Sequence, residues 1–316
     1  MNQATVIADS VTIRGHRLIT IEVTLPRCVL AEFNTHRTHS RNSASSRAIP
    51  AHRLISAITS APFIPTWTAA NRGMVASGLL ADIEGQHVAD QATTLWLAAR
   101  DAMVRFTAEL TALGVAKQDA NRLLEPFTFT TIVATATEQA WRWFFGLRDS
   151  EQADPKFAVP ARMMHEAYKA SKPRPLRDGD WHLPYIGDAD IAAVRRDYGF
   201  CDVPHLDDLS ATDRTEVQQT LAKMSAARCA RISYLRQHEE RELSDELLRH
   251  HELVRMRHWS PTEHQARANS LSVGGRGGNL GAGWDQHRHI IGDGYAESGG
   301  PYSVTIGTAT DETSHG

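Results

Sequence analysis

An alternating run of apolar and polar residues at positions 18–25 limits the fold more than any other segment. Isoleucine, valine and leucine occupy the odd positions from 19 onward, whereas Thr20, Glu22 and Thr24 occupy even ones. A period of two is typical of a strand with one buried face, and Pro26 ends it because proline cannot donate to a sheet. The chain therefore needs a sheet with a covered apolar side.

Helical periodicity and a second strand complete the expected fold class. Apolar residues recur at steps of three and four over residues 88–113, and Gly114 ends this run, which predicts a core helix. The β-branched residues at 128–135 predict another strand, after which Thr137 can cap a helix. We expect an α+β fold, with a mixed or antiparallel sheet flanked by helices. Further helices are expected over residues 117–124, 157–171, 213–230 and 244–257, and irregular segments over 60–80 and 172–210.

Composition excludes several classes of protein. The 316 residues carry 34 Lys and Arg against 37 Asp and Glu, a balance that argues against a protein that coats nucleic acid. No apolar run reaches the roughly 20 residues of a membrane span. The N-terminal residues lack a signal-peptide pattern, and three scattered cysteines suit reduced thiols. We expect a cytoplasmic protein with no membrane or nucleic-acid partner, and we expect no metal site because no compact ligand motif occurs.

A dense polar stretch follows the first predicted strand. Residues 34–47, Asn-Thr-His-Arg-Thr-His-Ser-Arg-Asn-Ser-Ala-Ser-Ser-Arg, contain three arginines, two histidines and four serines. Forked guanidinium donors and adaptable hydroxyl groups suit a phosphate group. A solvated basic loop has the same composition, so spacing alone leaves both interpretations open.

The same stretch resembles the signature of the flavin-dependent thymidylate synthases, Arg-His-Arg-x-x-Ser-x-Asn-Glu-x-Ser-x-Arg-Tyr. Thr35, Ser43 and Ala48 depart from that signature. Six positions match it: His36, Arg37, Ser40, Asn42, Ser45 and Arg47. Four more segments resemble other blocks of the family: residues 114–126, 143–153, 230–234 and 258–264.

The order of these blocks differs from the family. The blocks at 230–234 and 258–264 precede the signature in the family but follow it here, which predicts a circularly permuted chain. We expect a thymidylate synthase-like catalytic domain over residues 1–270 and a glycine-rich, partly disordered extension over 271–316. Permutation also predicts that residues 228–265 pack against the strand at 18–25.

The resemblance implies the chemistry and the residues that carry it. The family uses FAD, with methylenetetrahydrofolate and NADPH as co-substrates, to methylate C5 of dUMP, in a homotetramer with active sites between subunits. By residue-to-residue match, Arg148 and His258 lie at the reacting centre. The nucleotide would contact Glu32, Ser45, Ser46, Arg47, Arg122 and Arg148. FAD would contact His36, Arg37, Asn42, Gln139, Trp143, Ser233, Ser260 and Glu263, although Gln139 and Trp143 replace the residue types of the family.

Other interpretations compete with this one. Glu32 stands where the family has glutamine, and a carboxylate beside a phosphate would repel it. The substrate could therefore be dCMP or UMP, or the product could carry a hydroxymethyl group. A non-catalytic nucleotide-binding homologue is a further alternative. Arg122 and Arg148 lie on predicted helices, where arginines are often solvated or ion-paired.

Overall fold

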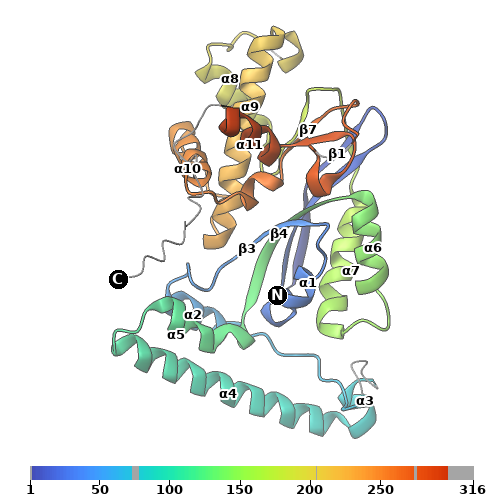
Figure 1. Ribbon diagram of the computed structural model, residues 1–316. Helices are drawn as coiled ribbons and strands as arrows, with labels where there is room; N and C mark the ends of the chain where they lie inside the picture. Colours follow the sequence, from blue (N-terminus) through green and yellow to red (C-terminus); the bar gives the residue numbers. More distant parts are fainter. Residues whose placement is uncertain (1, 73–77, 204, 274–275, 298–316) are drawn as a thin grey trace, which may run out of the picture.

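A five-stranded sheet forms the centre of the computed structural model, which describes residues 2–72, 78–203, 205–273 and 276–297 (Figure 1). The strand order is β3-β4-β2-β1-β5. All neighbouring strands are antiparallel except β1 and β5, so the sheet is mixed, as expected. The bounds are β1 (Gln3–Thr12), β2 (Arg17–Pro26), β3 (Ser40–Ser43), β4 (Phe129–Thr137) and β5 (Arg174–Leu176).

One face of the sheet is an apolar core. The odd-numbered residues of β2 from Ile19 to Leu25 are fully buried and pack with Trp141, Phe144 and Phe157. These aromatic side chains come from α6 (Glu138–Arg148) and α7 (Pro155–Ala170), which cover this face together with α1 (Leu30–Asn34). The apolar face that the alternation predicts for this strand is thereby confirmed.

The predicted helix cap is also confirmed. The Thr137 hydroxyl accepts a hydrogen bond from the backbone N–H of Ala140 at 3.3 Å, which satisfies one of the free donors in the first turn of α6. Since Thr137 is the last residue of β4, this cap joins the central sheet directly to the helix that ends at Arg148.

The second half of the chain covers the other, more polar face of the sheet (Figure 1). Glu22 accepts hydrogen bonds from Tyr185 at 2.6 Å and from Gln237 at 3.0 Å, so residues 228–265 do pack against β2. The circular permutation itself stays a prediction. This half contains a three-stranded sheet of β6 (Trp181–His182), β7 (Ala266–Ala268) and β8 (Trp284–Gln286), with α8 (Asp188–Asp197), α9 (Ala211–Arg231), α10 (Leu243–Arg255) and α11 (His287–Glu297).

The longest helix, α4 (Gln86–Ala112), was correctly predicted as a helix but wrongly as a core element. It lies along the edge of the molecule, away from the central sheet (Figure 1). Leu95 is 72% exposed, and Ala89 and Thr107 are its buried residues. Periodicity identifies an apolar face but does not show what covers that face. Nearby elements are α2 (Ala51–Ser60), α3 (Leu80–Glu84), α5 (Lys117–Ala120) and a 3₁₀ turn over Asn121–Phe127.

The segments expected to be irregular contain more structure than predicted. Residues 172–210 include β5, β6 and α8. From Gly277 to Gly283 the glycines permit close packing, because a Cβ at Gly277 would collide with the backbone oxygens of Gly281 and Trp284. Residues 274–275 of the expected flexible loop and the tail at 308–316 lie outside the described residues. The domain boundary at residue 270 stays a prediction, although β7 and β8 pair across it.

No helix in the described part of the chain has both the length and the apolar character needed to cross a membrane.

Candidate active site

Arg148 is held at the C-terminal end of α6 by neutral groups. Its Nε donates to Nε2 of His36 at 3.0 Å, and its guanidinium carbon lies 4.8 Å from the centre of the Phe157 ring. Its other amino group contacts the backbone oxygen of Glu32 at 3.5 Å and the hydroxyl of Thr35 at 3.4 Å. Arg148 forms no ion pair with any described carboxylate, so its charge remains available to an anionic or polarised ligand.

Two histidines of residues 34–47 pack together beside Arg148: the rings of His36 and His39 lie 5.9 Å apart, and His36 contacts Arg148. The ring of His36 packs edge-on against Phe144, with 4.8 Å between centroids. Burial, together with the charges of Arg148 and Arg41, lowers the pKa of His36 to about 4. Burial also lowers the pKa of His39, to about 3. A neutral His36 can accept a hydrogen bond from Arg148, whereas an imidazolium would repel it.

A carboxylate organises the residues predicted to bind phosphate. Glu125 Oε1 accepts from the Ser46 hydroxyl at 2.5 Å and from Arg122 at 2.9 Å. It also forms an ion pair with Arg27 at 3.2 Å. Arg27 and Glu125 were not among the predicted site residues, because the contact joins three segments that are distant in the sequence. Arg47 is exposed, and its side chain has no partner in the described part of the chain.

A third group joins β3 to the C-terminal half. Asn42 Nδ2 donates to the hydroxyl of Ser260 at 3.0 Å, and the backbone N–H of Ser45 donates to the oxygen of Ser233 at 3.1 Å. Glu263, in the same 3₁₀ turn as Ser260 (Ser260–Glu263), is ion-paired with Arg288. The structure thus brings together four predicted FAD contacts from positions 42, 233, 260 and 263.

The remaining predicted residues lie on the surface. The side chains of Glu32, Arg37, Gln139 and His258 are exposed and form no hydrogen bond or ion pair with the residues that the structure describes. Glu32 meets Arg148 only through its backbone oxygen. Trp143 is 64% exposed on α6.

The exposed side chains among the predicted FAD contacts have the kinds of chemistry that a flavin nucleotide needs. A flavin has an apolar ring system that stacks on aromatic side chains, ring acceptor atoms that take hydrogen bonds, and phosphates that suit arginine. Among the predicted FAD contacts, the exposed indole of Trp143, the exposed hydroxyl of Ser260 and the exposed guanidinium of Arg37 offer these three kinds of contact, each from a different segment of the chain.

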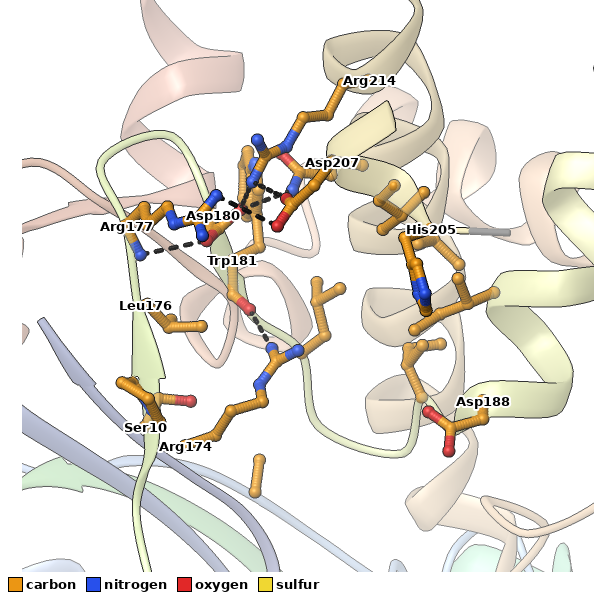
Figure 2. A pocket seen from close by; sticks show the side chains of 18 of the residues that line it. Ser10, Arg174, Leu176, Arg177, Asp180, Trp181, Asp188, His205, Asp207 and Arg214 are labelled. Atoms are coloured by element: carbon orange, nitrogen blue, oxygen red, sulfur yellow. Dashed lines mark hydrogen bonds and ion pairs between the residues drawn. The ribbon is translucent and has the colours of Figure 1, made fainter. Parts of the chain in front are cut away.

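A cavity of about 900 Å³ lies elsewhere, between β1, β5 and the helices α8 and α9 (Figure 2). Arg214 pairs with Asp180 and Asp207 at its rim, and Arg177 also pairs with Asp207, at 3.0 Å. None of the predicted site residues lines this cavity.

The family described as thymidylate synthase complementing protein matches residues 9–174, which is more than half of the chain and includes the signature and Arg148. The chain belongs to this family, the flavin-dependent thymidylate synthases. It is a thymidylate synthase-like methyltransferase. The matched segment ends before Ser233, so the roles of the later residues stay predictions.

Among solved structures, the chain is similar to a UMP/dUMP methylase, PolB, from Streptomyces cacaoi, in a crystal structure bound with 5-Br dUMP. The TM-score is 0.38 and the sequence identity 21%, over 48% of this chain and 67% of that one. No curated protein matches the chain.

Proposed function

We propose that this thymidylate synthase-like methyltransferase methylates C5 of a pyrimidine nucleotide, converting dUMP to dTMP. Methylenetetrahydrofolate would supply the one-carbon unit, and NADPH would reduce a bound FAD. The observation that carries this proposal is the environment of Arg148, whose charge faces no described carboxylate and is held by the neutral imidazole of His36.

This environment suits the chemistry of C5 substitution. When C5 of a pyrimidine attacks an electrophile, electron density moves and negative charge develops on the ring carbonyl oxygens. A positioned guanidinium in a partly dehydrated site stabilises such charge. The flavin, when bound, supplies hydride transfer, while the protein binds and orients the reactants.

The phosphate end of the nucleotide would meet Arg47, Ser45 and Ser46, in competition with the bonds that the Ser45 backbone N–H makes to Ser233 and the Ser46 hydroxyl to Glu125. Arg122 lies beside them but is ion-paired with Glu125. The predicted repulsion by Glu32 is weakened, since its side chain is exposed and forms no described ion pair. Glu125 is a second carboxylate that would repel the phosphate, because it lies 2.5 Å from the Ser46 hydroxyl. The second candidate remains dCMP, UMP or a hydroxymethylated product, because Ser43 and Ala48 also depart from the signature of the family.

FAD would meet His36, Arg37, Asn42, Gln139, Trp143, Ser233, Ser260 and Glu263, and His258 would lie near the flavin and the reacting centre. Several of these side chains are exposed in the single chain. A homotetramer with active sites between subunits, as the family resemblance implies, would cover them. We place the enzyme in the cytoplasm.

A substrate panel tests this proposal. Reduced, FAD-loaded protein is incubated with labelled methylenetetrahydrofolate and, separately, with dUMP, UMP and dCMP. We expect label in dTMP, and mass spectrometry of the product distinguishes methyl from hydroxymethyl. Label confined to a cytosine product would contradict thymidylate synthesis. A colourless protein that cannot be reconstituted with FAD would contradict flavin-dependent methylation altogether.

A further inference from the structure

A chain of polar side chains crosses the central sheet beneath the C-terminal half. Six hydrogen bonds of 2.6–3.0 Å connect these side chains across β1, β2, β4 and β3. In order, its members are Ser10, His182, Thr20, Thr135, His264, Asn42 and Ser260. All but Asn42 and Ser260 are buried. No function assigned so far uses the first five.

The Asn42 carboxamide sets the direction of the chain. Its Nδ2 donates to Ser260, so its Oδ1 can only accept, and Nε2 of His264 must donate to it across 2.9 Å. A neutral imidazole carries one hydrogen, so Nδ1 of His264 must accept, and the Thr135 hydroxyl donates to it at 2.8 Å.

The hydrogen bonds from Thr135 to Ser10 have the same direction. The Thr135 oxygen accepts from the Thr20 hydroxyl at 2.6 Å, and Thr20 in turn accepts from Nε2–H of His182 at 2.8 Å. Nδ1 of His182 then accepts from the Ser10 hydroxyl at 2.9 Å. Every hydrogen in this segment points toward Asn42.

The direction of the hydrogen bonds requires both histidines to be neutral. His182 and His264 are fully buried, and burial lowers the pKa of each to about 3. For His182 the nearby positive charge of Arg174 acts in the same sense. Each ring is therefore neutral around pH 7 and carries a single N–H, so that it accepts on one side and donates on the other.

The two ends of the chain differ. Ser10 lines the cavity of Figure 2. Ser260 is exposed, and its hydroxyl oxygen already accepts from Asn42. Its own hydrogen has no acceptor among the described side chains, so the exposed Ser260 hydroxyl is free to donate to a ligand.

We propose that this chain is a positioning device for the flavin nucleotide: it fixes the Asn42 carboxamide, so that Ser260 presents its hydrogen to an acceptor atom of the bound flavin. His264, Thr135, Thr20 and His182 act through Asn42 and are positioning residues. The inference rests on the proposed flavin-dependent function for the identity of the ligand, whereas the direction of the chain is a property of the protein alone.

Nitrogen NMR of the flavin-free protein, with ¹⁵N-labelled histidine, tests the direction. The chemical shifts of the ring nitrogens distinguish a protonated from an unprotonated nitrogen. We expect His182 and His264 both to carry their hydrogen on Nε2 at pH 7, with assignment by His182→Gln and His264→Gln. Hydrogen on Nδ1 of either ring would overturn the proposal, because the carboxamide would then face the other way or the chain would be broken.

A double-mutant cycle on FAD affinity tests the coupling. Ser260→Ala should raise the Kd for FAD about tenfold, and Thr135→Val about fivefold, as expected for a hydrogen bond that is lost or misdirected. If Thr135 acts through Ser260, the double variant should bind FAD no more weakly than Ser260→Ala alone. Two losses that multiply would overturn the coupling.

A matched threonine pair provides the control. Thr24 and Thr131 face one another on β2 and β4, 2.9 Å apart, but lie outside the chain. Thr131→Val should therefore change the Kd for FAD by less than about twofold. An effect as large as that of Thr135→Val would show that the loss reflects the sheet and not the chain. Wild-type protein that binds no FAD would refute the proposed function, while the NMR result would still decide the direction of the chain.

Discussion

The two arginines predicted to hold the nucleotide lie in opposite electrostatic environments. Arg148 is bounded by an imidazole, an aromatic ring, a hydroxyl and a backbone oxygen, all uncharged. Arg122 faces Glu125, which also holds Arg27 and Ser46. The charge of Arg148 is therefore available to a substrate, whereas Arg122 is ion-paired with a carboxylate that it shares with Arg27. Two arginines that match the same family equally well therefore differ in their electrostatic surroundings.

Removal of Arg148 should have the largest effect. We expect Arg148→Ala to lower kcat about 100-fold, because a donor that stabilises developing charge is lost. FAD retention should change little, since His36 and the rest of the surface remain. Turnover and bound flavin are measured on the same preparation. Arg142→Ala, on the same helix and ion-paired with Glu138, is the control. Equal losses of turnover and flavin would refute the role assigned to Arg148.

The neutral state of His39, which packs with His36 beside Arg148, can be tested through the pH dependence of stability. The pKa of His39 is about 3 in the folded protein, below the ordinary value of 6.5, so the unfolded chain binds more protons between these values. The folded state loses stability as the pH falls through 6.5. His39→Phe removes the contribution of this histidine to the pH dependence of stability. Between pH 7 and pH 5, its free energy of unfolding should fall less than that of the wild type, by about 2 kcal/mol. Urea titrations at both pH values measure this difference, and identical pH slopes would contradict it.

The carboxylate at the other arginine should have a smaller, opposite effect on binding. We expect Glu125→Gln to tighten the binding of dUMP about fivefold at low ionic strength, because repulsion of the phosphate is removed and Arg27 and Arg122 are released. The gain should shrink as salt is added. Calorimetric titration gives both values. Glu109→Gln, in an exposed ion pair on α4, is the control. Weaker binding would show that Glu125 holds the site together more than it opposes the phosphate.

The smallest effect is expected at Arg122 itself. Because its charge is already paired, Arg122→Ala should raise KM for the nucleotide only about twofold, as is typical of exposed ion-paired arginines. In the Glu125→Gln background the same substitution should cost more, since Arg122 is then free to meet the phosphate. Steady-state kinetics of the single and double variants decide this point. A loss at Arg122 as large as that at Arg148 would remove the distinction between the two sites.

Local patterns in the sequence were sufficient to predict the apolar face of β2 and the Thr137 cap. Both depend on neighbours within a few residues, where period and hydrogen-bonding type are decisive. The packing of residues 228–265 against β2 was also predicted, but from the order of family blocks and not from periodicity.

Features that depend on distant residues were missed. The sequence does not single out Glu125, because its contacts with Arg27 and Ser46 join positions that no short window contains. For α4 the apolar stripe was correct, but what covers it cannot be inferred from the helix alone. The glycine-rich run before Trp284 predicts a flexible loop, whereas Gly277 allows two backbone segments to pack closely, which composition cannot distinguish.

The covering of the polar face of β2 has a consequence for how the chain folds. The partner of Glu22 at Gln237 lies 215 residues later, and that of Asn42 at His264 lies 222 residues later. Contacts of such sequence separation form late, because a long loop must close before they stabilise anything. During synthesis, the first two strands therefore wait with one side unsatisfied until almost the whole chain has emerged. Folding of this enzyme should be slow and completed after translation, and its intermediates should be the species most exposed to aggregation.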